Sequence, residues 1–204
     1  MENQCSQIML YRKSLKRKLA PMRYEHSLSV SYTCMNLAMR YGCSLDKAEL
    51  AGLLHDCAKC YDNNSIIAAC RNSGMELTEG ELQAPSIIHS RLGARMAEEK
   101  FGVNDPEILS AIACHTTGKP DMSLLDKILY IADYIEPRRY KIKDLPAIRR
   151  LAFEDLDQAL FQIMEGTLRY LKESGTYADI MTQNAYHYYK KQMCRQKEEQ
   201  KEGE

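Results

Sequence analysis

Apolar side chains recur along this chain with the spacing of α-helices. Leu50, Leu53 and Leu54 stand three and four residues apart, an interval that places them on one face of a helix and against a core. Valine, a residue typical of strands, occurs only at 30 and 103, and no run alternates apolar and polar residues over the length of a strand. The pattern therefore predicts an all-α fold.

Capping residues and helix stops divide this pattern into segments. Ser44 and Ser123 stand at N-cap positions, Thr78 and Glu81 have the spacing of a capping box, and Gly42 is typical of a left-handed C-terminal stop. A polar tail follows the last segment. The predicted helices cover 6–19, 22–41, 45–59, 64–73, a short turn at 78–81, 85–101, 106–115 and 124–136, with two or three more after them, the last from about 177.

Length and composition indicate one compact helical bundle. A chain of 204 residues, 45% of them hydrophobic, fills one core and is short for two. We expect a single domain over 1–192, followed by a charged tail over 193–204 that has no apolar period and is disordered.

The charge balance and the start of the chain limit the partners. The 28 basic and 28 acidic side chains cancel, which leaves no broad field for a nucleic-acid duplex. No stretch is apolar enough for a membrane span, and the polar start MENQCSQ lacks the segments of a signal peptide. The chain is therefore expected to be cytoplasmic. Its eight cysteines, most of them inside amphipathic helical patterns, are expected to be reduced.

A histidine and an aspartate stand together at the end of an apolar helical face. His55 is followed by Asp56 in the segment AGLLHDCAK, where two polar groups would be buried without partners. An imidazole and a carboxylate are ordinary ligands of a divalent transition metal, and neighbouring helical residues can reach one ion lying between them. The pair is therefore a candidate metal site.

Other histidines and an aspartate extend this site. His26 lies one helix earlier and Asp133 lies inside the apolar run ILYIADYIE, so that with the His-Asp pair they offer two nitrogens and two oxygens to a first ion. His89 and His115 each adjoin an apolar helical face and are free for a second ion, with Asp56 as a bridge. With one ion only, these two histidines would instead contact substrate phosphate.

The order of these residues resembles that of a known family. The segments RYEHSLSV, AGLLHDCAK, IIHSRLGA, AIACHTTG and LDKILYIADYIEPRR are similar to those of the HD superfamily, and more closely to those of its YqeK-type symmetrical diadenosine tetraphosphate hydrolases. The likeness covers about residues 10–190. It implies a helical HD domain whose first metal is held by His26, His55, Asp56 and Asp133, and whose second is held by His89, His115 and the shared Asp56.

The resemblance also implies an activity and a cofactor. A dinucleoside polyphosphate, diadenosine tetraphosphate, would be cut between its two central phosphates into two ADP. The two divalent ions would most often be iron, although manganese, cobalt and zinc suit the same donors. Because members of the family and oligomers in general favour two-fold pairs, we expect a homodimer.

Polar residues near the ligands are candidates for catalysis and substrate binding. Lys59 follows His55 by four residues and would contact a phosphate oxygen or pair with Asp56. We take Asp56 and Lys59 as the catalytic candidates. Arg23, three residues before His26, would clamp a phosphate or form a surface ion pair.

Two further segments are substrate-binding candidates. Thr116, Thr117 and Gly118 follow the fourth ligand histidine, and their hydroxyls and amides would bind phosphate or cap the broken helix. Glu136 and Arg138 lie about one turn beyond the last ligand and would contact base, sugar or phosphate. The resemblance favours a role in the pocket for both segments.

The predicted reaction is hydrolysis without a covalent enzyme intermediate. A water between two cations about 3.5–4 Å apart would lose a proton near neutral pH and attack phosphorus as a metal-bound hydroxide. The same ligands would serve an HD phosphohydrolase or phosphodiesterase acting on another nucleotide, a two-iron oxygenase, or a non-catalytic metal-dependent nucleotide sensor. Product analysis separates the hydrolases, because only symmetrical cleavage of the tetraphosphate gives ADP alone. Oxygen-independent turnover would exclude the oxygenase, and tight binding without product would support the sensor.

Overall fold

The described part of the chain is helical throughout. The computed structural model describes residues 2–202, with the side chains of 6–195 and of 198. Over this range all regular structure consists of α-helices and two 3₁₀ turns, which confirms the predicted all-α fold. The elements are α1 (Glu2–Lys18), α2 (Pro21–Tyr41), α3 (Leu45–Leu54), η1 (Cys57–Cys60), α4 (Asn63–Asn72), α5 (Glu79–Gln83), η2 (Pro85–Ile87), α6 (Ile88–Phe101), α7 (Pro106–Cys114), α8 (Leu124–Ile135), α9 (Leu145–Glu154), α10 (Leu156–Glu173) and α11 (Ile180–Glu202).

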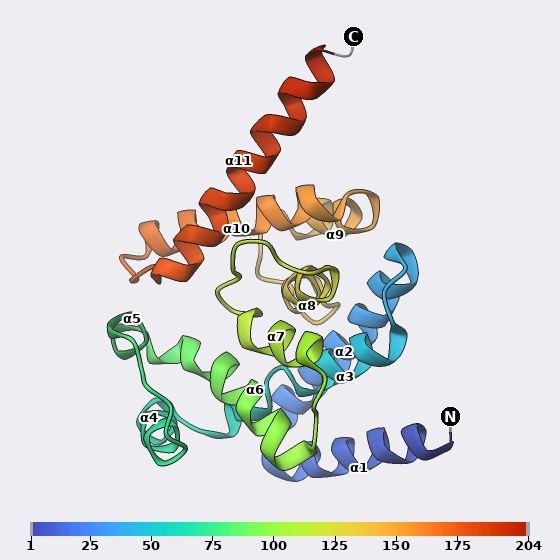
Figure 1. Ribbon diagram of the computed structural model, residues 1–204, viewed down its shortest axis with the longest axis vertical. Helices are drawn as coiled ribbons and strands as arrows, with labels where there is room; N and C mark the ends of the chain where they lie inside the picture. Colours follow the sequence, from blue (N-terminus) through green and yellow to red (C-terminus); the bar gives the residue numbers. More distant parts are fainter. Residues whose placement is uncertain (1, 203–204) are drawn as a thin grey trace.

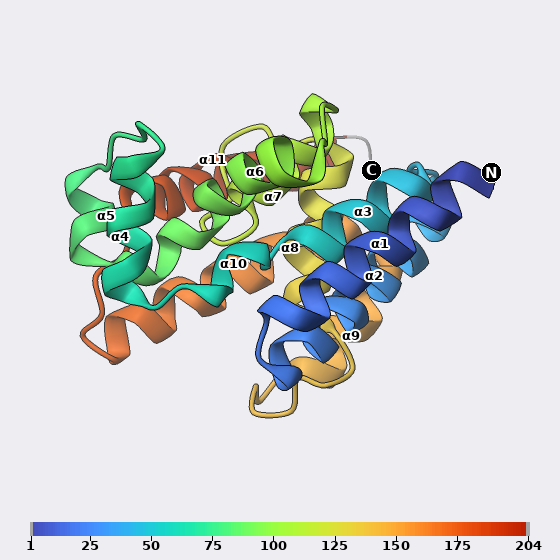
Figure 2. The same cartoon turned by 90° about the horizontal axis from the view of Figure 1, so that it is seen from below.

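The middle of the molecule is a bundle formed by α2, α3, α7 and α8. Helix α2 packs on α3 and α8, and α7 packs on α6 and α8. Helices α9 and α10 cover α8 from the other side, while α11 leans on α10 and its C-terminal end projects from the body (Figure 1). Helices α4 and α5 stand together at one end of the molecule (Figure 2). One cluster of buried apolar side chains runs from Leu15 in α1 to Tyr189 in α11.

Local chemistry sets most of the helix ends. The side chains of Ser44, Thr78 and Ser123 accept hydrogen bonds from backbone amides of the first turns of α3, α5 and α8. The last two form complete capping boxes. Gly42 ends α2 with a φ of 74°, in the left-handed region where glycine is favoured.

Two segments differ from the prediction. Helix α3 ends at Leu54 instead of 59, because the backbone leaves the helical region at Asp56 (φ −104°, ψ 18°) before η1 begins. Lys59 therefore does not share a helix face with His55. The tail expected to be disordered continues α11 as far as Glu202, built from strong helix formers such as lysine, glutamine and glutamate. Residues 203 and 204 of that expected tail lie outside the described residues.

The remaining expectations concern cysteines and membranes. The seven cysteines whose side chains are described are all free, as expected, and the side chain of Cys5 lies outside the described part. Among the described helices, none has the length and apolar character needed to span a bilayer.

Candidate metal centre

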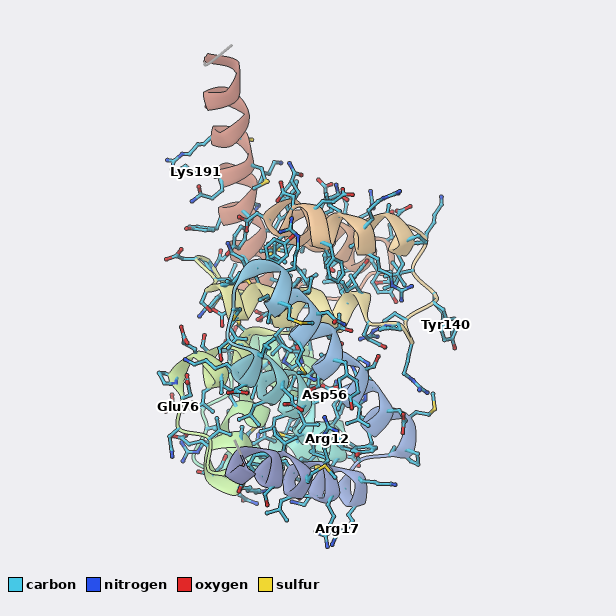
Figure 3. All side chains as sticks on the ribbon, turned by 90° about the vertical axis from the view of Figure 1, so that its right-hand side faces the viewer. Arg12, Arg17, Asp56, Glu76, Tyr140 and Lys191 are labelled. Carbon is cyan, nitrogen blue, oxygen red and sulfur yellow. The ribbon has the colours of Figure 1, made fainter. Side chains whose placement is uncertain are left out.

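Six side chains from five parts of the chain meet at the centre of the bundle. They form three overlapping groups, in each of which the candidate ligand atoms lie within 4.8 Å of one another. The structure thus brings together every predicted metal ligand, and Figure 3 shows Asp56 inside the body of the molecule. The six are His26 on α2, His55 and Asp56 after α3, His89 on α6, His115 after α7 and Asp133 on α8.

Three of the histidine rings are oriented in the same way. In His55, His89 and His115 the Nδ1 atom lies 2.7, 2.6 and 2.7 Å from the carbonyl oxygen three residues earlier in the chain. A carbonyl only accepts, so Nδ1 carries the proton and donates it. In each ring Nε2 is then left as an acceptor that points into the cluster. A histidine ligand whose other nitrogen donates to a carbonyl is typical of metal sites.

The inward nitrogens lie too close together to be satisfied by one another. The Nε2 atoms of His89 and His115 are 3.1 Å apart, and Nε2 of His89 is 3.2 Å from Oδ1 of Asp56. Buried Nε2 of His55 has no hydrogen-bond partner among the described residues. Lone pairs that face each other in a buried site repel, and a cation between them removes both the repulsion and the unpaired acceptor. The donor set therefore fits a divalent metal.

Asp56 lies between the two halves of the cluster. Its Oδ1 faces His89 and His115 at 3.2 and 3.8 Å, whereas its Oδ2 faces His55 and His26 at 3.4 and 3.8 Å. The residue is only 2% exposed. Burial alone would raise the pKa of Asp56, but the surrounding histidines hold it well below its usual range. A carboxylate that faces both halves has the position of a bridging ligand.

His26 is oriented differently from the other rings. Its Nε2 lies 3.0 Å from Oδ1 of Asp133, and its Nδ1 lies 3.1 Å from Oε1 of Glu136. Burial would lower the pKa of His26, but its contacts with the carboxylates of Asp133 and Glu136 raise it to about 9. Burial lowers the pKa of His89, by contrast, to about 4.

Glu136 has a place that differs from the expected contact with substrate. It is 1% exposed, and its Oε2 accepts hydrogen bonds from the Ser29 hydroxyl and the Arg138 amide, both at 2.7 Å. With Oε1 on His26, both carboxylate oxygens are occupied by the protein. Glu136 therefore orients a candidate ligand.

Three cationic side chains surround the cluster. Arg23 donates to Oδ2 of Asp56 at 2.6 Å, and Arg139 donates to Oδ1 of Asp133 at 2.7 Å, with each side chain about two-fifths exposed. Lys59 lies 3.4 Å from the carbonyl of Ser86, and burial lowers the pKa of its ammonium group. These groups lie beside the candidate ligands and are open to a charged molecule from outside.

Arg139 is a site residue that the sequence analysis missed. The predicted residue was Arg138, but its guanidinium lies 3.6 Å from Glu25 and 3.8 Å from the sulfur of Met22, away from the cluster. The two arginines are adjacent in the segment EPRR, and only the path of the turn after Pro137 decides which one faces the aspartate.

The loop after His115 contributes unequally. The Thr116 hydroxyl lies 3.2 Å from Nε2 of His89, beside the cluster, while the Thr117 hydroxyl donates to the carbonyl of Gly118 at 3.0 Å. Gly118 is buried with a φ of 67°, and its amide donates to Cys114 at 2.8 Å. Because this amide already donates to the last residue of α7, it is not free to bind a phosphate, which differs from the expectation.

Comparison with known proteins places this cluster in a family. Residues 23–138 match the HD domain family, a range that contains all six candidate ligands. The chain belongs to the HD domain family. The buried histidines and aspartates are thus a cluster of the kind typical of this domain, and they suggest a metal site.

Relatives of known name cover most of this HD domain protein. It is 36% identical to the "Bis(5'-nucleosyl)-tetraphosphatase, symmetrical" of Halalkalibacterium halodurans, over 82% of this chain and 89% of that one. It is 38% identical to the protein of the same name from Bacillus subtilis, over 77% and 83%. A crystal structure of a predicted HD superfamily hydrolase involved in NAD metabolism, from Clostridium acetobutylicum, matches with a TM-score of 0.87 and 38% identity, over 91% of this chain and 97% of that one.

Proposed function

We propose that this HD-type hydrolase cleaves diadenosine tetraphosphate symmetrically into two ADP. The observation that carries the proposal is the similarity to two symmetrical tetraphosphatases over more than three quarters of the chain. The clustered acceptor atoms of its buried centre agree with it, because hydrolysis of a phosphoric anhydride requires strong neutralisation of negative charge.

The six clustered residues are proposed to hold two divalent ions. His26, His55 and Asp133 would serve one ion, and His89 and His115 the other, with one oxygen of Asp56 directed to each. Bound ions would supply neutralisation of the phosphoryl oxygens and acidification of the attacking water. Asp56 is proposed as catalytic because it sets the separation of the two positions, and its low pKa keeps it ionised at neutral pH.

The cations around the centre are proposed to bind the polyphosphate. Arg23 and Arg139 each use part of the guanidinium on an aspartate, and the exposed remainder is free to form paired hydrogen bonds to phosphate oxygens. Lys59 would contact the phosphate that leaves. Thr116, beside His89, would offer a hydroxyl to the phosphate under attack.

The bond changes follow from the products. Oxygen of water forms a bond to one of the two central phosphorus atoms, and the bond from that phosphorus to the central bridging oxygen breaks. One ADP keeps the bridging oxygen and the other gains the oxygen of water. No covalent bond to the protein is needed, because positioning and charge neutralisation supply the catalysis.

Product analysis tests this proposal. Metal-loaded protein is incubated with diadenosine tetraphosphate in ¹⁸O-labelled water, and nucleotides are separated by chromatography and weighed. We expect ADP alone, with one labelled oxygen in half of the molecules. Asp56→Asn should reduce the rate at least about a hundredfold, whereas Asp46→Asn, on the exposed first turn of α3, should not. AMP, ATP or inorganic phosphate as the main product would contradict symmetrical cleavage.

The identity of the metal and the assembly are further parts of the proposal. Iron is proposed for both positions, with manganese, cobalt or zinc as the other metals that suit imidazole and carboxylate donors. Elemental analysis of protein purified without chelator identifies the metal. A homodimer is proposed for the assembly, and light scattering measures its mass.

A further inference from the structure

We propose that Arg149 is a positioning residue that fixes one half of the metal centre from a distance. Arg149 lies on α9, and its guanidinium donates hydrogen bonds to three backbone carbonyls of the turn that follows α8. These are the carbonyls of Ile135, Glu136 and Arg139, at 2.8, 2.8 and 2.9 Å.

The geometry of these bonds makes the turn rigid. The last carbonyls of a helix have no partner inside the helix, and Ile135 is the last residue of α8. One planar guanidinium satisfies this carbonyl and also the carbonyl of Arg139 at the far side of the turn. The two ends of the turn are therefore held at a fixed separation. A lysine could not replace Arg149, since a lysine ammonium lacks the forked donors of a guanidinium.

The same turn carries both outer contacts to one half of the centre. Oε1 of Glu136 accepts a hydrogen bond from Nδ1 of His26 at 3.1 Å, and Arg139 donates to Oδ1 of Asp133 at 2.7 Å. Arg139 also donates to the backbone carbonyl of Asp133 at 3.1 Å. A turn that moves would therefore shift the partners of both His26 and Asp133.

The other half of the centre does not depend on this turn. His89 and His115 are oriented by carbonyls of their own segments, three residues earlier in the chain. Loss of Arg149 is thus expected to weaken metal binding at the position of His26 and Asp133 about tenfold, since partners of ligands typically contribute ten- to a hundredfold to metal affinity. The position of His89 and His115 should be unchanged. This selectivity rests on the proposed metal centre.

Titration with Mn²⁺ tests the inference. Full-length protein is freed of metal with chelator, and Mn²⁺ binding is followed by calorimetry and by the electron paramagnetic resonance of the free ion. The variants are Arg149→Met and Arg149→Lys, with Arg150→Met as the control. Arg150 is the next residue of α9, is exposed and forms no ion pair with any described residue. We expect both Arg149 variants to lose affinity at one class of site, and the control to match wild type.

Two further readouts separate positioning from general damage. Amide hydrogen exchange should rise at Glu136, Arg138 and Arg139 in the Arg149 variants, while the helices keep their protection. ADP formation should recover at saturating Mn²⁺, because the ligands themselves are intact. If Arg149→Met loses its helical circular dichroism, Arg149→Lys, which keeps the charge and the aliphatic stem, decides the question.

The outcomes distinguish this inference from the proposed function. If the Arg149 variants bind Mn²⁺ as tightly as Arg150→Met at every site, the positioning role is wrong, although the hydrolase proposal stands. An equal weakening of all sites would also overturn the role, because it indicates general destabilisation. If wild type binds no divalent metal, the proposed metal centre is wrong, and the positioning role of Arg149 is wrong as well.

Discussion

Replacing Gly52 with alanine should separate helix propensity from helix packing in this bundle. Gly52 lies in α3, where it faces α2, and a Cβ added to it would lie 2.7 Å from Cα of Ser31 and 3.0 Å from the sulfur of Cys34. The first of these neighbours is backbone, which has no rotamer to change. Gly166 in α10 is a matched control, because the nearest atom to an added Cβ is the Tyr134 hydroxyl at 4.0 Å.

The expected effects on stability have opposite signs. Alanine in place of glycine inside a helix stabilises by about 0.5–1 kcal/mol where it fits. Gly166→Ala should show this gain. Gly52→Ala gains the same propensity but forces α2 and α3 apart, an overpacking that typically costs about 1–3 kcal/mol. The middles of the two ranges give a net loss of about 1 kcal/mol, which should lower the Tm by about 2–4 °C in a chain of this size.

A second effect should appear only at Gly52. Its carbonyl accepts the hydrogen bond that orients His55, so a displaced α3 also displaces a candidate ligand. Thermal unfolding of both metal-free variants, followed by Mn²⁺ titration, measures the two effects. We expect lower stability and about tenfold weaker binding for Gly52→Ala, with neither loss in Gly166→Ala. A Gly52→Ala protein as stable as Gly166→Ala would refute the close packing of α2 on α3.

Four other predictions concern charged groups. Arg139→Met should raise the KM for diadenosine tetraphosphate about tenfold or more, because a charged hydrogen bond to the substrate is lost. In the same ADP assay the control Arg138→Met should keep a KM within about twofold of the wild-type value. Lys59→Met should lower kcat/KM about tenfold without changing Mn²⁺ affinity in calorimetry, because Lys59 contacts no ligand directly; a changed affinity would contradict this. Because the pKa of His26 is raised to about 9, a metal ion that binds there must displace a proton at neutral pH. The affinity for Mn²⁺ at this position should therefore rise about tenfold per pH unit between about 7 and 9. The same raised pKa stabilises metal-free protein below pH 6.5 and loses that contribution as the pH rises through about 9, which urea unfolding at several pH values would detect.

Features set by neighbouring residues could be predicted from the sequence. Helix starts at Ser44, Thr78 and Ser123 were predicted correctly, because a cap and the amide it accepts from are within three residues of each other. The six candidate ligands that the structure brings together were also selected from the sequence. Five of them stand beside or within an apolar helical face, where a polar group requires a partner, and His26 was carried by the family resemblance.

Features set by the path of the chain could not be predicted. Glu136 and Arg138 were both expected at the substrate, but the turn around Pro137 places Glu136 against His26, directs Arg138 to the outside and brings Arg139 to the cluster. Helical periodicity does not extend through a turn that contains proline. The role of Arg149 could not be predicted from sequence spacing either. Its partners are backbone carbonyls, which every residue has, so that no particular side chain in the sequence indicates the contact.

The different orientation of His26 follows from its position in a helix. His55 and His115 stand at the C-terminal ends of α3 and α7, where the carbonyls three residues earlier belong to the last turn and have no helical partner. Each ring therefore satisfies a free carbonyl of its own helix. His26 lies within α2, where the carbonyls of the preceding turn are already used by the helix, so its Nδ1 requires an acceptor from elsewhere. Glu136 supplies that acceptor, and a ligand oriented from another segment is only as fixed as that segment. The three hydrogen bonds of Arg149 thus do for His26 what the helix ends do for His55 and His115, while the ring of His89 is oriented by the carbonyl of Ser86.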